Sequence, residues 1–360
     1  MRILAIETSC DETGAAVVEK KGNEQFAKVL SNVLTSSATI QAQFGGVIPE
    51  QAAREQVKFI IPIIAEVLLG SEKIEQGSAE ENYKKANKIL KEKIDAIAVT
   101  HGPGLIGPLL VGVETAKTLS FALNKPIVPV HHLLAHIFAN FILNTKYSIL
   151  NTEKMFPFIG LIVSGGHTDL LLFESVSKFK WLGGTLDDAA GETLDKIGRL
   201  LNISYPAGPE IETRASRIKK TNIKFQSPLI NSDDFDFSFS GLKTEASRFI
   251  QKQHLTERLI NEVCYALQRA TFAVLFKKTI RAIKLYKINT ILLGGGVSAN
   301  QTLLENLKLE IRNLKLDIEV FAPAKTYATD NAAMIGTHAL LNYKPLAWHK
   351  ITAKPDLYFG

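Results

Sequence analysis

The chain has 360 residues, of which 46% are hydrophobic, 22% charged and 8% aromatic. This composition is that of an ordinary globular protein and excludes a disordered, collagen-like or coiled-coil chain. The formal net charge of +6 favours an anionic partner without identifying one, and the two cysteines, Cys10 and Cys264, are too few for a disulfide scaffold.

The N-terminal apolar run ends at Glu7, too early for a signal peptide. No uncharged stretch reaches the roughly 18 apolar residues that a membrane helix needs. We therefore expect a cytoplasmic protein that binds no membrane. At about 150 residues per domain, the length predicts two domains.

One strand pattern occurs twice along the chain. Two short apolar runs flank a polar segment, first around residues 7–14 and again around residues 164–169. Each pattern predicts two strands joined by a tight polar turn. The paired runs are 3–6 with 15–18, and 158–163 with 170–173.

A second element is also repeated. The apolar runs 94–100 and 288–293 each lead into a glycine-containing segment, 101–104 and 294–296 respectively. Short continuous apolar runs between helical patterns are typical of buried parallel strands in an α/β sheet. The repetition indicates a duplicated α/β chain.

Two similar α/β halves suggest two lobes that face each other across a ligand cleft, lined by the loops at the strand ends. We place the lobes at residues 1–150 and 151–360, and expect the last segment, about 325–360, to pack back on the first lobe. The stretch 71–93 has six lysines and five glutamates, which predicts a solvated surface loop and helix.

Two histidines have the spacing of a metal site. In a helix from about His132 to Ile142, His132 and His136 project from one face and can bind one divalent ion, provided that a third ligand exists. A structural role is the alternative interpretation. A zinc peptidase needs a glutamate directly after the first histidine, but this position is Leu133.

The polar trio Thr329-Asp330-Asn331 opens an apolar helix. Such residues are favoured at helix N-caps, which is one interpretation of the trio. The other is that Asp330 supplies the third ligand of a His-His-Asp site suited to iron or zinc.

The glycine segments 163–166 and 294–300 lack the lysine of a P-loop and the spacing of a dinucleotide-binding motif. Backbone amides at strand ends and helix starts can still bind phosphate. Several carboxylates lie near these segments in the sequence: Asp11, Asp169, Asp187, Asp188 and Asp195.

Taken together, the motifs resemble those of the bacterial TsaD family, once described as glycoprotein endopeptidases. The matching segments extend over nearly the whole chain: Ile6–Thr13, Phe44–Glu50, His101–Gly104, His132 with His136, Ser164–Thr168, Asp187–Glu192, Phe237–Thr244 and Thr329–Asn331. The family is similar in fold to actin and the heat-shock ATPases, with two ribonuclease-H-like lobes around a nucleotide cleft.

The resemblance implies transfer of a threonylcarbamoyl group from threonylcarbamoyl-AMP to N6 of the adenosine 3′ of the anticodon, in tRNAs reading codons that begin with A. It implies that His132, His136 and Asp330 bind one divalent metal, Fe(II) by preference over Zn(II). It further implies Asp11, with its neighbour Glu12, as acidic catalytic residues. The adenylate would be held by Ile162, Val163, Ser164, Gly165, Gly166, Asp195, Gly208 and Asn300.

The resemblance also implies TsaB and TsaE as protein partners, with TsaB docked on the first lobe; DNA is not an expected partner. Within the second half, Lys277, Arg281 and Lys284 share one face of a helix, which predicts either a solvated surface or contacts with tRNA phosphates. Two other functions remain open: a nucleotide-gated actin-like scaffold and a metallopeptidase.

Overall fold

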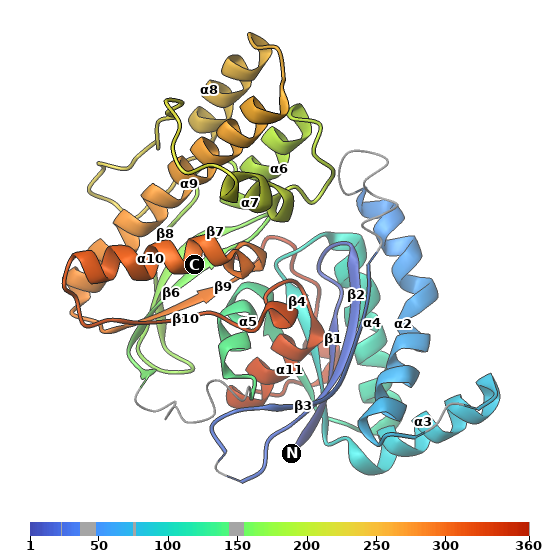
Figure 1. The fold of residues 1–360 in the computed structure, drawn as a ribbon. Coiled ribbons are helices and arrows are strands. Elements are labelled where there is room, and N and C mark those ends of the chain that lie inside the picture. The colour runs from blue at the N-terminus through green and yellow to red at the C-terminus, as the bar shows by residue number, and fades with distance from the viewer. Residues whose placement is uncertain (23, 37–47, 75–76, 144–154, 360) are drawn as a thin grey trace. The chain divides into compact units, whose positions relative to one another are not determined.

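The structure, a computed structural model, describes residues 1–22, 24–36, 48–74, 77–143 and 155–359 (Figure 1). The chain divides into two compact units. Unit 1 consists of Met1–Lys154 with Asp330–Gly360, and unit 2 of Met155–Thr329. The expected lobe boundary at 150/151 and most of the motif Phe44–Glu50 lie outside the described residues.

Unit 1 contains a five-stranded sheet in the order β3-β2-β1-β4-β5. The predicted first hairpin is confirmed, because β1 and β2 pair antiparallel, and β4 pairs parallel to β1 as expected. The sequence analysis did not identify the edge strands β3 and β5. The strands are β1 (Arg2–Glu7), β2 (Glu12–Glu19), β3 (Lys28–Ser36), β4 (Ala96–Gly102) and β5 (Ile127–His131).

Helices cover both faces of this sheet (Figure 1). Alternate strand residues such as Leu4 and Ile6 join a core with α2 and α4, whereas Ala5 and Val18 face α11. A Cβ added to Gly336 of α11 would lie 2.3 Å from a Val18 methyl, so glycine permits this close packing. The helices are α2 (Pro49–Ser71), α4 (Ile106–Leu123), α5 (His132–Phe138) and α11 (Ala332–Leu341), with short 3₁₀ helices at Ala139–Phe141 and Trp348–Lys350.

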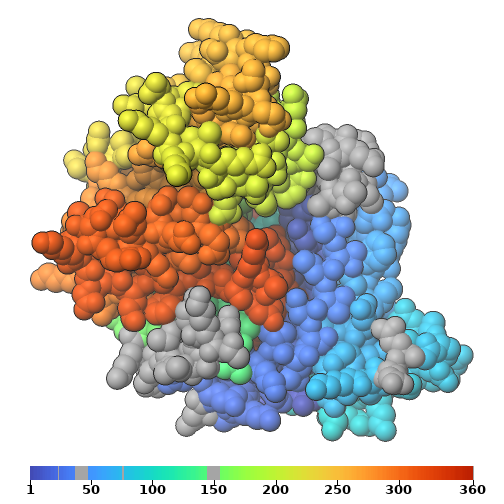
Figure 2. Space-filling model, viewed as in Figure 1, coloured from blue at the N-terminus to red at the C-terminus, as the bar shows by residue number. Residues whose placement is uncertain are grey.

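The lysine- and glutamate-rich stretch forms α3 (Ala79–Lys93) after the end of α2. A capping box of Ser78 and Glu81 starts this helix. Its buried residues are Ala86, Ile89 and Leu90, and the other described side chains are exposed or half-buried. Figure 2 shows α3, in cyan, as a projection at the edge of unit 1, as expected for a solvated surface helix.

One helix among the described residues, α4, is long and apolar enough by length and composition to span a membrane. It is a third buried in unit 1, where it packs on β4 and α2. Its Glu114 and Lys117 side chains form an ion pair at 2.7 Å. Core helices of this kind pass the same test of length and hydropathy.

Unit 2 repeats the topology of unit 1. Its sheet has the order β10-β9-β6-β7-β8, in which β6 and β7 form the antiparallel hairpin and β9 lies parallel to β6. The prediction of two duplicated α/β halves is therefore confirmed. The strands are β6 (Phe158–Val163), β7 (Thr168–Phe173), β8 (Phe179–Gly184), β9 (Thr290–Gly294) and β10 (Glu319–Phe321).

Alternate residues of this sheet, such as Leu161 and Leu293, build one large core with the helices of unit 2. The longest helix, α9, contributes Leu267, Phe272 and Leu275 to this core. The helices are α6 (Ala190–Leu200), α7 (Gly208–Ser216), α8 (Ser240–Gln251), α9 (Glu257–Tyr286) and α10 (Gln301–Asn313), with short 3₁₀ helices at Gly296–Ala299 and Lys325–Tyr327.

Candidate functional site

The two histidines lie where the edge strand β5 passes directly into a helix. Strand β5 ends at His131, and α5 begins at His132, so the spacing of four places the His132 and His136 rings 4.7 Å apart. Both side chains are buried. The predicted helix end at Ile142 is wrong: α5 ends at Phe138 and tightens into a 3₁₀ turn, in which the Ile142 amide donates to the Ala139 carbonyl.

Asp330 lies beside the histidines, directly before α11. Its Oδ1 is 3.5 Å from His132 Nε2 and 3.2 Å from His136 Nε2. The cap of α11 is Asn331, whose side chain accepts a hydrogen bond from the Met334 amide at 3.0 Å. The two interpretations of the trio therefore apply to different residues, because Asn331 is the cap and the Asp330 carboxylate faces the imidazoles.

The geometry of this cluster fits a divalent metal ion. The three potential ligand atoms all lie within 4.8 Å of one another. Ligand atoms at roughly 2.0–2.2 Å from one shared ion lie about 3–3.5 Å apart, close to the spacing of both nitrogen–oxygen pairs. Two imidazoles and one carboxylate leave further coordination positions for a substrate.

The buried carboxylate of Glu7 contacts His132 on the Nδ1 side of the ring. Glu7, at the end of β1, has Oε2 3.1 Å from His132 Nδ1, and Thr100 Oγ1 donates to the same oxygen. Glu7 Oε1 accepts a hydrogen bond from the Ser9 amide at 2.6 Å. A carboxylate that holds Nδ1 orients the ring and leaves Nε2 for an ion. The sequence analysis did not assign this role to Glu7; its signal is a carboxylate directly after the apolar run 3–6 of β1.

Burial and neighbouring charges set the protonation of these groups. Burial lowers the pKa of His132, but Glu7 and Asp330 outweigh it and raise that pKa well above its usual value. Burial opposes ionisation of Asp330, yet the charge and hydrogen bond of His132 hold its pKa well below the usual range. For His136, burial dominates and lowers the pKa, which favours the neutral imidazole that ligates metals.

Of the predicted catalytic residues, Asp11 ends the turn between β1 and β2, and Glu12 is the first residue of β2. Asp11 is buried, and burial, followed by the charges of Asp330 and Asp11, raises the pKa of Glu12 well above its usual value. The Gln56 side chain donates hydrogen bonds to the carbonyls of Cys10 and Glu12, at 3.0 and 2.9 Å. Gln56 thus ties this acidic turn to α2.

Backbone atoms of neighbouring segments pack closely against the same turn. The Leu105 amide donates to the Ser9 carbonyl at 2.8 Å. A Cβ added to Gly104, which has φ +157°, would lie 2.6 Å from the Ser9 carbonyl oxygen, and one added to Gly112 would lie 2.3 Å from Thr8 Oγ1. Gly104, which follows β4, and Gly112 of α4 therefore have no room for a methyl group against this turn.

The corresponding turn of unit 2 is open instead. The Ser164 amide donates to the His167 carbonyl at 2.8 Å, and the His167 amide donates to Ser164 Oγ at 3.1 Å. A Cβ added to Gly165 or Gly166 would meet no described atom within 4 Å. Ile162 and Val163 are buried in β6 and anchor this turn to the sheet.

The remaining predicted adenylate residues also lie in unit 2. A Cβ added to Gly295 would lie 2.4 Å from the Val163 carbonyl oxygen, so the segment that leads to Asn300 packs against the end of β6. Asn300 caps α10 by accepting from the Leu303 amide at 2.9 Å. Asp195 accepts from the Ala207 amide at 2.7 Å, next to Gly208 at the start of α7. Burial raises the pKa of Asp195.

The other carboxylates that the sequence places near the glycine segments bind protein groups. Asp187 accepts hydrogen bonds from the hydroxyls of Ser238 and Ser240, both at 2.6 Å. Asp188 pairs with Lys196 and Lys243. Asp169 accepts from the Trp181 indole at 3.1 Å. These contacts indicate structural roles.

The basic face of α9 is less uniform than its sequence suggests. Lys277 donates to the Asn231 side chain at 2.6 Å, and Lys284 is exposed. Arg281 instead donates to the backbone carbonyls of residues 232 and 234. Lys278, part of the same basic run, is buried and pairs with Asp234 at 2.9 Å. Three of these four cations thus bind the loop of residues 231–236, which precedes α8, and Lys284 has no side-chain contact of this kind among those described.

Comparisons with known proteins point in one direction. The family model for TsaD, tRNA N6-adenosine threonylcarbamoyltransferase, matches residues 28–337. A protein of that description from Kosmotoga olearia is 45% identical over 336 residues, covering 93% of this chain and 91% of the relative. One from Clostridium perfringens is 39% identical over 362 residues, covering 99% and 98%.

A similar fold occurs in a solved structure of full-length HypF in its phosphate- and nucleotide-bound form. The TM-score is 0.57 at 13% identity, over 96% of this chain and 47% of that longer chain. At this identity the similarity shows the fold alone.

Proposed function

This chain belongs to the TsaD family of tRNA N6-adenosine threonylcarbamoyltransferases, and we propose that it carries out the transfer with one metal ion bound by His132, His136 and Asp330. The observation that carries this proposal is the convergence of the two Nε2 atoms on Asp330 Oδ1. The chemistry that such an ion supplies when bound is polarisation of the carbamoyl group of the donor. Fe(II) is the proposed ion, with Zn(II) as the alternative that the same ligands accept.

We assign the adenylate part of threonylcarbamoyl-AMP to the open glycine turn of unit 2. Amides of Ser164, Gly165 and Gly166 would bind the phosphate, because backbone N–H groups at a strand end attract anions. The other proposed contacts are Ile162, Val163, Asp195, Gly208 and Asn300, with the Asp195 carboxylate on the ribose hydroxyls. The empty space around Gly165 and Gly166 supports this assignment.

In the proposed step, the N6 amine of the tRNA adenosine attacks the carbamoyl carbon. A carbon–nitrogen bond forms, the bond from the carbamoyl group to the phosphate breaks, and AMP leaves. We assign the proton lost from N6 to Asp11. Burial, followed by the charges of Asp330 and Asp11, raises the pKa of Glu12, which favours its protonated form more than in an exposed glutamate.

We further propose that the α9 face of unit 2 contacts tRNA phosphates. The structure changes the relative weight of the three residues, because Arg281 is bound to backbone carbonyls, whereas Lys284 is exposed and Lys277 has one neutral partner. Lys277 and Lys284 are therefore the residues to test first. Each phosphate contact should steepen the salt dependence by about 0.7–0.9 log units per log unit of salt.

We propose α2 and α4 of unit 1 as the docking face for TsaB, with TsaE as a further partner and the cytoplasm as the compartment. The two helices pack together and expose the apolar residues Val57, Ile61, Ile106 and Leu110, each between 44% and 63%. Leu110→Asp should prevent TsaB binding in a pull-down. The control Leu285→Asp alters a residue of unit 2 that is 63% exposed and should leave binding unchanged.

The function is tested by mass analysis of tRNA nucleosides. Cells that lack the protein should lose threonylcarbamoyladenosine, and the wild-type gene should restore it whereas His132→Ala should not. A normal level of this nucleoside in depleted cells would reject the function. Restoration by His132→Ala would reject the metal site while leaving the transferase activity in place.

A further inference from the structure

Unit 2 contains a hollow of about 980 Å³ that the proposed reaction does not use. It lies along α9, between α10 and the segment that follows α7, and none of the proposed adenylate contacts is among its lining residues. Its volume is at the upper end of the range of about 300–1,000 Å³ found for small-ligand sites. The described residues that line this hollow include the aromatic, polar and basic side chains expected of a binding site.

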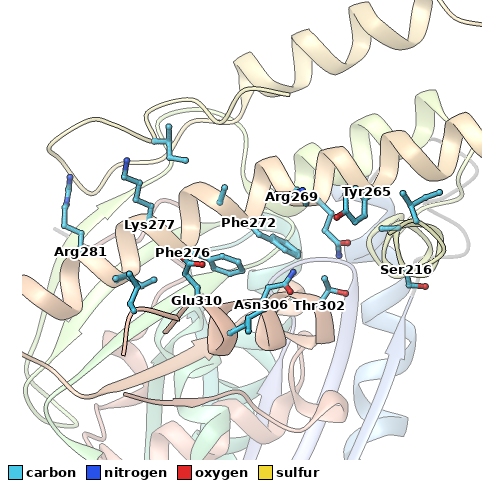
Figure 3. Close-up of a pocket in the computed structure, with 18 of the residues that line it drawn as sticks. Ser216, Tyr265, Arg269, Phe272, Phe276, Lys277, Arg281, Thr302, Asn306 and Glu310 are labelled. Atoms are coloured by element: carbon cyan, nitrogen blue, oxygen red, sulfur yellow. The ribbon is translucent and has the colours of Figure 1, made fainter. Parts of the chain in front are cut away.

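The floor of the hollow is aromatic. Phe272 and Phe276 project from α9 toward α10, where Asn306 lies (Figure 3). Their ring centroids are 6.0 Å apart, and Phe276 is half-buried, so part of its ring is accessible. Tyr265, about two turns before Phe272 on α9, also lines the hollow. Such rings offer stacking surfaces to a planar ligand.

A buried polar group also lines this floor. Gln268 is 3% exposed, and its Nε2 has no hydrogen-bond partner among the described residues. Buried amide groups are almost always hydrogen-bonded, because an unpaired donor loses its water without replacement. Because Nε2 is itself buried, a ligand atom would satisfy this donor once the amide turns toward the hollow.

The rim of the hollow is positively charged. Arg269 lies over the Tyr265 ring, with its guanidinium carbon 5.7 Å from the ring centroid, and Lys277 and Lys284 follow along the same helix. All three are exposed, and Glu310 is the acidic residue of the lining. The hollow therefore combines an aromatic floor, a buried donor and a basic rim, which together match a base and its phosphates.

We propose that this hollow binds an unpaired nucleotide of the tRNA substrate, with the base against Phe276, an acceptor of the base edge on Gln268 Nε2, and phosphates on Arg269 and Lys277. This inference rests on the proposed contact between α9 and tRNA. An acidic peptide helix would use the basic rim as well, but it would cover the floor with apolar side chains and leave Gln268 Nε2 unpaired. The buried amide therefore favours a nucleotide over a peptide.

The test compares binding of single-stranded and double-stranded RNA of the same sequence to the full chain. Gln268→Leu removes the unpaired donor, so the variant should fold at least as well as the wild type. Its affinity for a 12-nucleotide single strand should fall about 5- to 10-fold, as expected for one lost hydrogen bond, whereas duplex affinity should not change. Phe276→Leu keeps an apolar side chain without the ring and should give the same selective loss.

A charge variant separates base from phosphate contacts. Lys277→Glu should weaken binding of single strand and duplex alike, and lower the salt slope by about 0.7–0.9. Lys252→Glu is the matched control, because Lys252 is an exposed lysine of unit 2 that does not line the hollow. Gln268→Leu should leave the salt slope unchanged.

The outcomes distinguish this inference from the proposed function. If Gln268→Leu and Phe276→Leu bind single-stranded RNA as tightly as the wild type, the nucleotide site is rejected. If, in that case, the wild-type gene still restores threonylcarbamoyladenosine in depleted cells, only the nucleotide site in the hollow is rejected and the proposed function is retained. A wild-type chain that binds no RNA and restores no modified nucleoside would contradict both.

Discussion

The turns that follow the first strand of each unit occupy equivalent places in the same topology, yet they differ in charge and in the space they leave open. The β1–β2 turn of unit 1 carries carboxylates and is packed so closely that the neighbouring Gly104 and Gly112 admit no methyl group. The β6–β7 turn of unit 2 is also contacted closely from outside, by Gly191 and Gly295, but its own glycines, Gly165 and Gly166, face open space. The duplicated sheet is thus a common scaffold, and the chemistry differs in its loops.

This difference has a physical basis. The proposed metal site would need rigid ligands and supporting contacts, and in unit 1 Glu7 contacts both His132 and the packed Ser9 turn. A phosphate site needs backbone amides that a ligand can approach closely, which side chains would block. The following predictions test whether unit 1 holds the proposed metal site and unit 2 the proposed phosphate site.

The largest effect is expected from removing a metal ligand. His136→Ala should lower metal affinity by more than about 100-fold, since even supporting residues cost about 10- to 100-fold. Metal content per chain and nucleoside analysis measure the two consequences. The control is His254→Ala, an exposed histidine of unit 2. An ion retained at full occupancy by His136→Ala would exclude this histidine as a ligand.

Two glycine-to-alanine substitutions, one at a glycine packed against the β1–β2 turn and one within the β6–β7 turn, test this contrast. Gly104→Ala should destabilise the fold by about 2–4 kcal/mol in denaturant unfolding, because its Cβ would lie 2.6 Å from a carbonyl oxygen and its φ is +157°. Gly165→Ala should unfold like the wild type but bind an adenylate analogue at least about 10-fold more weakly, because the methyl group occupies the proposed phosphate position. If both variants lost the same amount of stability, the two turns would not differ in how closely they are packed.

A smaller loss is expected from the supporting carboxylate. Glu7→Gln should weaken metal binding by about 10-fold while the fold is retained, because the amide keeps the size but cannot act as an anionic acceptor for His132 Nδ1. Metal titration of the purified variant gives the affinity. Glu7 would have no positioning role if the variant titrated like the wild type.

The smallest predicted effect concerns pH. The buried histidines among the described residues are His132, His136 and His338, all in unit 1. Burial lowers the pKa of His338 to about 4. The unfolded chain, with an ordinary pKa near 6.5, therefore binds a proton before the folded chain does, and stability should fall as the pH decreases from about 6.5 to about 4.

His338→Leu removes this titration and should reduce the acid-induced loss of stability by about 1–3 kcal/mol. Chemical unfolding at pH 7 and pH 4.5 measures it for both proteins. If the loss of stability between these pH values were the same in the variant, His338 would not be its source.

The sequence predicted the repeated features of the fold well, because they depend on local patterns. Short apolar runs around a polar turn identified the hairpins, and glycine-terminated apolar runs identified the central parallel strands. The edge strands β3, β5, β8 and β10 were missed. Strands β3 and β8 have several half-buried or exposed positions, and β5 and β10 are only five and three residues long. The end of α5 was also wrong, because the change to a 3₁₀ turn depends on packing around Phe138 and Phe141.

The site was predicted in part. The spacing of four residues indicated His132 and His136 as a pair. For Asp330, the residues allowed either a helix cap or a third ligand, and the family resemblance favoured the ligand. Glu7, 125 residues before His132, and the burial of Lys278 against Asp234 depend on tertiary contacts that no local pattern encodes. For the same reason, the unpaired amide of Gln268 could not be recognised in a helical sequence.

The most direct test of the central claim is the metal content of two variants, one for each unit, measured on purified protein. The account predicts that His132→Ala contains no stoichiometric metal, whereas Gly165→Ala retains one ion per chain and loses affinity for the adenylate. Metal retained by His132→Ala, or lost from Gly165→Ala, would contradict the division of the metal and adenylate sites between unit 1 and unit 2.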